Sequence, residues 1–241
     1  MSIFRGLLFN LYFLLLTLIM GLGALPIRAL GRKDLALSYA KLWSRAVLFG
    51  FSRLCSVRID ITGQENIPSG PCLIASQHQS FFDGFVWMNL VPLPTYIIKQ
   101  ELTRIPLVGP MLILAGMIPV KRSDGSKALR TMMKDSADAH AANRQIIIFP
   151  EGTRTLPGER QSIQPGIIAL ARQASVPVVP VATNSGLFWD RLPLAQKTGH
   201  SEGRHWQTSP RDARARRLHR GAGKCLGRTV RNSRIAARSC G

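Results

Sequence analysis

An uncharged apolar run near the N-terminus restricts the fold of this chain more than any other feature. No charged residue occurs between Gly6 and Ile27, and Leu, Phe and Ile dominate the run. As a helix it would be about 33 Å long, enough to cross a bilayer core of about 30 Å. Arg5 and the small residues near Gly21 also suit a secretory signal peptide, but the run is long for one and ends in no clear cleavage motif. We therefore predict that residues 1–52 form a membrane helix or a helix pair.

Charged residues around this run predict its orientation. Arg28, Arg32 and Lys33 follow it, against Arg5 alone before it. Positive charge gathers on the cytoplasmic side of membranes, so we expect the rest of the chain on the cytoplasmic face of a bacterial-type inner membrane. Residues 35–51 have helical apolar spacing interrupted by basic residues, which predicts a helix lying on lipid with its basic side toward the headgroups. An ordinary amphipathic core helix has the same pattern, and this alternative stays open.

The composition indicates a negatively charged partner. The 241 residues carry a formal net charge of +19, which is typical of proteins that bind nucleic acid, an anionic membrane surface or phosphorylated substrates. The four cysteines show neither C-x-x-C pairing nor metal-ligand spacing with histidine. We therefore expect reduced thiols in a cytosol-facing protein, without disulfides and without a metal site.

Between residues 56 and 182, short runs of β-branched residues, or of alternating polar and apolar residues, are separated by segments whose apolar residues have helical spacing. The short runs predict strands over residues 56–62, 72–75, 96–98, 117–120, 145–149 and 176–182. The segments between them predict helices over residues 84–90, 106–116, 125–142 and 165–174. This alternation indicates an α/β fold, with a mixed sheet flanked by helices. Residues 53–200 are predicted to form this domain.

A histidine and an aspartate stand where the second predicted strand gives way to a helix. His78 follows that strand, and Asp83 comes five residues later. Within one continuous helix, five residues would turn the two side chains about 140° apart. They can meet only if His78 precedes the helix and Asp83 lies in its first turn, where the helix dipole favours a carboxylate. The pair would then resemble a general base with its orienting carboxylate, although a solvated turn has the same sequence.

Further polar residues follow other predicted strands. Lys99 and Arg122 each come directly after a short apolar run, and Pro150–Arg154 follows the β-branched run at residues 145–149. In α/β sheets, sites form where loops leave the ends of strands. These residues are therefore candidates for the same site as His78.

Four separated blocks of the sequence are similar to those of a known family. In chain order they are H-x4-D at residues 78–83, K-x-E-L…P-x-x-G at residues 99–109, F-P-E-G-T-R at residues 149–154 and V-P-V-x-P-V at residues 176–181. Together they resemble the glycerolipid acyltransferase family, the PlsC-like 1-acyl-sn-glycerol-3-phosphate or lysophosphatidic acid acyltransferases. The resemblance runs from about residue 56 to about residue 190, so residues 53–200 would be the acyltransferase domain. The pattern of the family ends beyond about residue 195.

The resemblance implies an enzyme of phospholipid biosynthesis. It implies transfer of a fatty acyl group from acyl-CoA or acyl-carrier protein to the free sn-2 hydroxyl of 1-acyl-glycerol-3-phosphate, giving phosphatidic acid. His78 with Asp83 would supply the general base, so that no nucleophilic Ser or Cys is needed. The lysophosphatidic acid acceptor would be bound by the basic and loop residues of the other blocks, namely Lys99, Arg122, Glu151, Gly152, Thr153 and Arg154. The acyl thioester is a co-substrate, and no cofactor or metal is implied.

Residues 201–241 differ in composition from the rest of the chain. They hold eleven basic residues against two acidic ones and few large apolar residues, so they cannot bury much of a core. Such an Arg-rich tail could be disordered and bind RNA or anionic lipid by charge alone. It could also be the out-of-frame end of a reading frame, which is the interpretation we favour.

Three other functions stay open at this point. An enzyme of the same family could act on another lysophospholipid or on an aminolipid, because the shared blocks do not separate these acceptors. The chain could also be a truncated or frameshifted inactive product. A basic nucleic-acid-binding or membrane-binding protein would explain the charge but not the F-P-E-G-T-R block at residues 149–154. We therefore rank this class last and expect no nucleic-acid partner.

Overall fold

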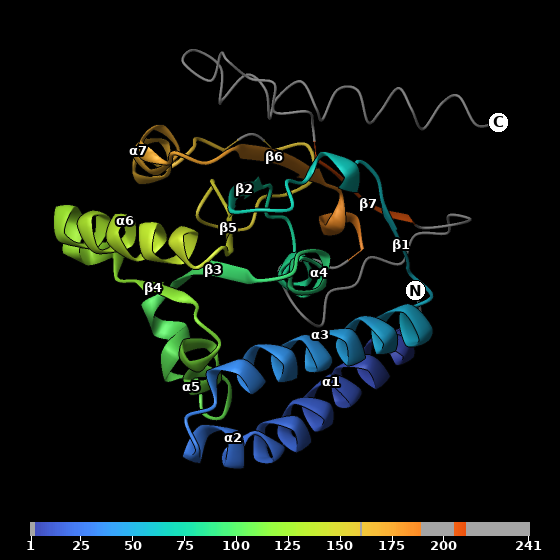
Figure 1. The fold of residues 1–241 in the computed structure, drawn as a ribbon. Helices are drawn as coiled ribbons and strands as arrows, with labels where there is room; N and C mark the ends of the chain where they lie inside the picture. Colours follow the sequence, from blue (N-terminus) through green and yellow to red (C-terminus); the bar gives the residue numbers. More distant parts are fainter. Residues whose placement is uncertain (1–2, 160, 189–204, 211–241) are drawn as a thin grey trace.

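A seven-stranded sheet forms the centre of the protein, in the order β1-β7-β6-β2-β5-β3-β4 (Figure 1). The computed structural model describes residues 3–159, 161–188 and 205–210. The strands are β1 (Arg58–Ile61), β2 (Cys72–Ser76), β3 (Pro94–Lys99), β4 (Ile118–Val120), β5 (Gln145–Ile148), β6 (Val178–Thr183) and β7 (His205–Pro210). All neighbouring strands are parallel except β6 and β7, which are antiparallel. The predicted α/β fold with a mixed sheet is thereby confirmed.

The central strands are apolar on both faces. Strand β2 lies between β5 and β6, with Ile74 opposite Ile147 on one side and Val179 on the other. All three side chains are fully buried. Parallel strands covered on both faces need apolar residues throughout, which explains the unbroken β-branched runs in the sequence. Because these strands are parallel, their carboxyl ends and the loops that follow meet at one edge of the sheet.

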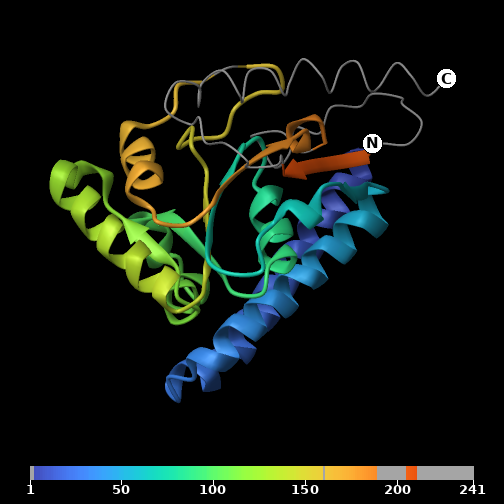
Figure 2. The same cartoon turned by 45° about the horizontal axis from the view of Figure 1, so that its top comes forward.

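Helices cover both faces of the sheet (Figures 1 and 2). They are α1 (Ile3–Gly23), α2 (Leu25–Ala29), α3 (Lys33–Cys55), α4 (Phe82–Leu90), α5 (Val108–Leu114), α6 (Gly125–Ala141) and α7 (Pro165–Gln173). Leu73 of β2 belongs to the apolar cluster that includes α6 and α7, whereas the next residue, Ile74, belongs to the cluster that includes α4 and α5. Successive side chains of a strand point to opposite faces, so one strand serves both layers.

The predicted strands and helices between residues 56 and 182 all occur, with ends that differ by a few residues. Two of these differences affect the candidate site. Helix α4 begins at Phe82 rather than at Gly84, which places Asp83 in its first turn. Strand β3 extends to Lys99, so this residue is the last of the strand and not the first of the loop.

Helices α1 and α3 lie side by side along one side of the molecule (Figures 1 and 2). Phe9 of α1 is fully buried, and its ring centroid lies 5.4 Å from that of Phe51 in α3. Helix α3 also packs on α4, where the Ser44 hydroxyl donates to the carbonyl of Phe85 at 2.6 Å. The buried face of α3 thus packs on protein, as in the core-helix alternative, while Leu42 and other apolar residues stay exposed.

Helix α1 carries a long exposed apolar face. By length and composition alone, the helix from Phe4 to Gly23 could cross a membrane, and 17% of it is buried within the described part of the chain. The uncharged run is not one helix, because the chain divides at Ala24 between α1 and α2. Pro26, near the start of α2, has no N–H to donate to the carbonyl four residues earlier, which favours a break at this point.

Strand β7 lies within residues 201–241, the segment predicted to be a disordered or out-of-frame tail. It pairs in parallel with β1 and antiparallel with β6, so six residues of the segment join the sheet. Strand β7 lies between β1 and β6, so the structure places residues 205–210 inside the sheet, and the assignment of residues 201–241 to a separate tail stays a prediction. Residues 201–204 and 211–241 lie outside the described residues, and there the tail stays a prediction.

Candidate active site

His78 lies in the turn between β2 and α4, at the carboxyl end of the central strand. The strand ends at Ser76 and the helix begins at Phe82, so His78 precedes the helix and Asp83 occupies its first turn. Nδ1 of His78 lies 3.1 Å from Oδ2 of Asp83. The structure therefore has the one arrangement in which the two side chains can meet at a spacing of five residues.

The carboxylate of Asp83 is fully buried and held by the backbone of the same turn. Besides the imidazole, Oδ2 accepts hydrogen bonds from the N–H groups of Gln79 and Ser80, both at 2.9 Å. These N–H groups lie in the turn just before α4, and the helix dipole favours a negative charge at Asp83 in the first turn. Local backbone thus holds Oδ2 of the carboxylate beside the imidazole.

A second loop holds His78 from the other side. The ring of Phe149 stacks on the imidazole, with centroids 4.1 Å apart and planes inclined by 22°. The carbonyl of His78 accepts hydrogen bonds from Thr155, from its N–H at 2.8 Å and from its hydroxyl at 3.1 Å. Thr155 was not among the predicted site residues, and its only sequence signal is that it directly follows the F-P-E-G-T-R block. Residues at both ends of the loop formed by the F-P-E-G-T-R block therefore contact His78.

Glu151 is buried in this loop, with 5% of its surface exposed. Burial raises the pKa of its carboxyl to about 7; the negative charge of Asp83 adds to the rise, and the N–H groups of Glu151 and His78 oppose it by donating hydrogen bonds. Its Oε2 atom has no hydrogen-bond partner among the described residues. The structure thus places a carboxyl group that gains and loses its proton near neutral pH beside the backbone of His78.

Gly152 and Arg122 are brought into contact, although about thirty positions separate them. Gly152 has φ +68°, a conformation that favours glycine. A Cβ placed on it would lie 3.1 Å from both terminal nitrogens of Arg122 and 3.1 Å from Cγ of Gln164. The absence of a side chain therefore allows the guanidinium to lie against the loop backbone.

The two predicted basic residues that follow neighbouring strands share one cleft. Lys99 ends β3 and pairs in register with Val120 of β4, directly before the turn that carries Arg122. The two side chains, with Glu101 and Ser123, line a cleft of about 350 Å³. Because Arg122 also touches Gly152, the cleft adjoins the loop that is fastened to His78.

Thr153 and Arg154 lie in the same loop, between the residue that contacts Arg122 and the residue that bonds to His78. Thr153 is exposed and Arg154 is half-buried. All eight predicted site residues thus belong to the His78 turn, to the loop fastened to it, or to the adjoining basic cleft. In the described part of the chain, no three His, Cys, Asp or Glu residues lie together so as to hold a metal ion.

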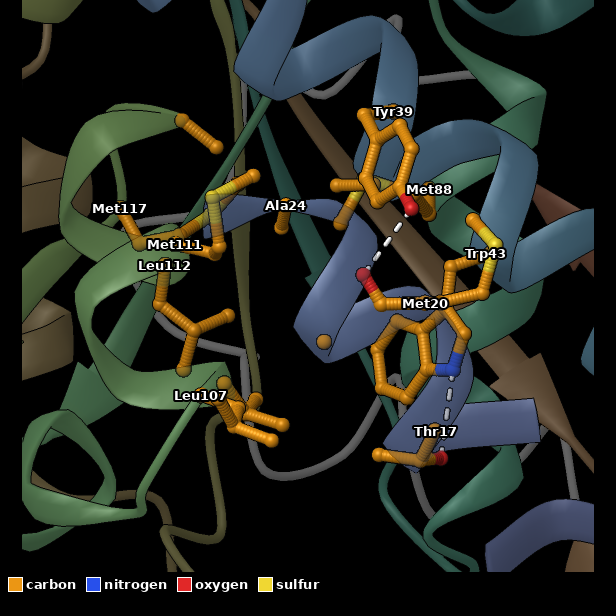
Figure 3. A pocket seen from close by; sticks show the side chains of 14 residues that line it. Thr17, Met20, Ala24, Tyr39, Trp43, Met88, Leu107, Met111, Leu112 and Met117 are labelled. Carbon is orange, nitrogen blue, oxygen red and sulfur yellow. Dashed lines mark hydrogen bonds between the residues drawn. The ribbon is translucent and has the colours of Figure 1, made fainter. Parts of the chain in front are cut away.

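A separate apolar cavity of about 50 Å³ lies between α1, α3 and α5 (Figure 3). The polar groups beside it are satisfied: the Tyr39 hydroxyl donates to the carbonyl of Met20 at 2.9 Å, and Nε1 of Trp43 donates to the hydroxyl of Thr17 at 3.3 Å. Four methionines line it, and methionine adapts its shape readily; they are Met20, Met88, Met111 and Met117. The cavity therefore offers apolar volume and no catalytic group.

Comparison with known proteins identifies the class to which this fold and site belong. The model of the acyltransferase family matches residues 58–184, which is more than half of the chain. The chain therefore belongs to the acyltransferase family. The solved structure of the 1-acyl-sn-glycerophosphate acyltransferase PlsC from Thermotoga maritima has the same fold, with a TM-score of 0.72 and 20% identity over 99% of this chain and 100% of that one.

Relatives of known name lie within the same family. The chain is 32% identical to the 1-acyl-sn-glycerol-3-phosphate acyltransferase of Pseudomonas aeruginosa over 157 residues, which are 65% of this chain and 61% of that protein. It is 35% identical to the human 1-acyl-sn-glycerol-3-phosphate acyltransferase beta over 116 residues, which are 48% of this chain and 42% of that protein. The matched region thus spans less than two thirds of either relative.

Proposed function

We propose that this protein transfers a fatty acyl group from an acyl thioester to the sn-2 hydroxyl of 1-acyl-glycerol-3-phosphate, giving phosphatidic acid. The observation that carries the proposal is the 3.1 Å contact between His78 Nδ1 and Asp83 Oδ2, in a turn fastened to a loop that reaches a basic cleft. The names of the relatives at 32% and 35% identity support the same reaction.

In the proposed reaction, His78 is the general base. The N–H at Nδ1 donates a hydrogen bond to Asp83, which leaves Nε2 to take the proton of the attacking hydroxyl. The hydroxyl oxygen forms a bond to the thioester carbonyl carbon, and the carbon–sulfur bond breaks as the tetrahedral intermediate collapses. The proton then passes from the imidazolium to the leaving thiolate. General-base catalysis of this kind typically contributes about 10²–10⁴-fold to the rate.

The acceptor phosphate is assigned to the basic cleft. Lys99 supplies a compact positive charge and Arg122 a planar fork of donors, and a phosphate binds well to both. Arg154 adds a third cation from the adjoining loop, where Gly152 lets the guanidinium of Arg122 lie against the backbone. This assignment favours an acceptor with a terminal phosphate over one with a zwitterionic headgroup.

Membrane association is assigned to the exposed face of α1. Large apolar side chains such as Phe4, Leu14 and Ile19 are 65–72% exposed on this helix, and basic residues follow it at Arg28 and Arg32. The apolar side chains would enter the acyl region and the basic ones would meet anionic headgroups. An acyltransferase held in this way reaches a lysolipid acceptor without extracting it into water. We place the domain on the cytoplasmic face of a bacterial-type inner membrane.

The experiment that tests the proposal measures acyl transfer by the full chain in lipid vesicles. The donors are radiolabelled acyl-CoA and acyl-carrier protein, tested separately, and the acceptors are 1-acyl-glycerol-3-phosphate, a lysophosphatidylethanolamine and a lyso-aminolipid. We expect transfer chiefly to 1-acyl-glycerol-3-phosphate and a loss of about 10²-fold or more in His78→Ala.

A matched control for this substitution is His140→Ala, since His140 lies on α6, away from the candidate site. It should retain turnover. Full turnover in His78→Ala would refute the general-base assignment, and equal transfer to all three acceptors would refute the assignment of the cleft to the phosphate.

A further inference from the structure

The two oxygens of the Asp83 carboxylate have unequal surroundings. Oδ2 faces Nδ1 of His78 and two backbone N–H groups of the turn. Oδ1 instead faces the hydroxyl of Thr183, at a distance of 3.4 Å between the two oxygens. The Asp83 side chain is fully buried, so water does not reach this oxygen. Among the described residues, Thr183 is therefore the side chain that satisfies Oδ1.

The direction of this hydrogen bond follows from the neighbours of Thr183. Its hydroxyl oxygen accepts the N–H of Ser185 at 3.2 Å. A hydroxyl has one proton to donate, and an ionised carboxylate can only accept. The proton of the Thr183 hydroxyl therefore points to Asp83.

Thr183 is itself held firmly next to the His78 turn. It is the last residue of β6, which pairs in parallel with β2. Its N–H donates to the side-chain oxygen of Gln77 at 3.5 Å, and the N–H of Gln77 donates to the carbonyl of Val181 at 2.9 Å. A β-branched side chain has few χ1 rotamers, so a fixed backbone also fixes the hydroxyl.

We propose that Thr183 is a positioning residue for the His78–Asp83 pair, an inference that rests on the proposed function. Thr183 acts through Asp83: its hydroxyl stops the carboxylate from turning about the Cβ–Cγ bond and so keeps Oδ2 on the imidazole. Without it, Oδ1 lacks a donor in a site closed to water, and the carboxylate turns to share its existing donors. The imidazole then holds its reactive orientation for a smaller fraction of the time.

Kinetics of two variants test this role. Thr183→Val keeps the shape of the side chain and removes the hydroxyl, whereas Thr183→Ser keeps the hydroxyl. We expect kcat to fall about 10-fold in Thr183→Val, a part of the general-base contribution, with little change in KM for the acceptor. Thr183→Ser should restore kcat to within about two-fold of the wild-type value. Equal losses in both variants, or an unchanged kcat in Thr183→Val, would overturn the proposal.

A spectroscopic readout tests the same role without turnover. In protein labelled with ¹⁵N-histidine, the proton on Nδ1 of His78 gives a downfield resonance while it is hydrogen-bonded to Asp83, and His78→Gln identifies it by its loss. The resonance should broaden or vanish in Thr183→Val and persist in Thr183→Ser. Its persistence in Thr183→Val would contradict the proposal, even if the wild-type chain transferred no acyl group. Thr183→Ala provides the same comparison if Thr183→Val does not fold.

Discussion

His78 is held by groups from two other parts of the chain, the first turn of α4 and the loop at residues 149–155. Asp83 bonds to its Nδ1, the ring of Phe149 stacks on its face, and Thr155 bonds twice to its carbonyl. The three contacts restrict, in turn, rotation of the ring, tilt of the ring and movement of the backbone. A general base is effective when its geometry is fixed before the substrate arrives, and these contacts would hold the proposed base in that way.

Gly152 provides a test of the loop at the scale of one residue. Gly152→Ala strains a backbone at φ +68° and pushes on Arg122, so we expect a several-fold rise in KM for the acceptor and a loss of about 1–2 kcal/mol in stability. Gly158→Ala is the matched control, because Gly158 has φ +86° and no atom near the added Cβ. It should lose similar stability with an unchanged KM. Steady-state kinetics and thermal unfolding measure both, and equal KM values for the two variants would contradict the role of the contact.

Glu151 predicts a particular dependence of stability on pH. Burial raises its pKa from 4.5 to about 7, so between these values the folded protein keeps a proton that the unfolded chain has lost. The free energy of unfolding should therefore fall as the pH rises from about 4.5 to about 7 and level off above, by about 3 kcal/mol at most. Glu151→Gln should remove this slope.

The measurement is chemical denaturation of the wild type and of Glu151→Gln across that pH range. Glu65→Gln is the control, since Glu65 is exposed, and it should keep the wild-type slope. Identical slopes in the wild type and in Glu151→Gln would show that the Glu151 carboxyl is not desolvated as the structure indicates.

At the scale of elements, close packing of α1 on α3 joins the apolar N-terminal helix to the α/β domain. A Cβ on Gly50 would lie 2.1 Å from the ring of Tyr12, whose hydroxyl donates to the carbonyl of Ala46 at 2.8 Å. Helix α3 in turn packs on α4, which begins at the site. The helix proposed to meet lipid is therefore connected to the His78 turn through one intervening helix.

Two glycine substitutions within helices separate packing from helix propensity. Gly50→Ala forces α1 away from α3 and should destabilise the protein by about 1–3 kcal/mol. Gly84→Ala adds a Cβ on α4 with nothing within 4 Å and should stabilise it by up to about 1 kcal/mol. Thermal unfolding in detergent measures both. A stabilising effect of Gly50→Ala would mean that the two helices do not pack as the structure shows.

At the scale of the whole molecule, the exposed face of α1 and the basic cleft have separate roles in the proposed enzyme. In the proposal, the apolar face attaches the protein to lipid, whereas Lys99 and Arg122 bind the phosphate of the acceptor. The formal net charge of +19 supports both, since the membrane surface and the substrate are anionic. The proposed enzyme would thus meet the lipid surface and its lipid substrate with different groups.

Flotation with vesicles tests the lipid-binding face. Leu11, Leu14 and Leu18 share one side of α1 and are 50–65% exposed. Replacing all three by Gln preserves the helix and removes the apolar contact, worth about 1.5–3 kcal/mol for each leucine that is fully buried in lipid. We expect the variant to stay with the unbound fraction, while the corresponding Leu→Met variant floats. Undiminished flotation of the Gln variant would exclude this face as the attachment surface.

The sequence predicted those parts of the protein that depend on short-range patterns. The strands and helices between residues 56 and 182 follow from periodicity and turn residues. The His78–Asp83 contact follows from a spacing of five residues at the start of a helix. Proximity of the other blocks followed from the rule that parallel strands gather their loops at one edge. All of these inferences use neighbours in the chain or a general rule of the fold.

Other features could not be inferred from short-range patterns. Thr183 lies 100 positions from Asp83, and Thr155 lies 77 positions from His78. Whether the apolar side of α3 meets protein or lipid, and how β7 pairs, likewise had no local signal.

The sequence by itself determined the elements of this protein and the identity of its candidate base, because periodicity and spacing act over a few residues. The tertiary structure alone decided which distant side chains support that base. Those contacts depend on the order of strands in the sheet, β6-β2-β5-β3-β4, which differs from their order in the chain. Strand order is set by the burial of all the faces together, and no single segment of the sequence contains that information.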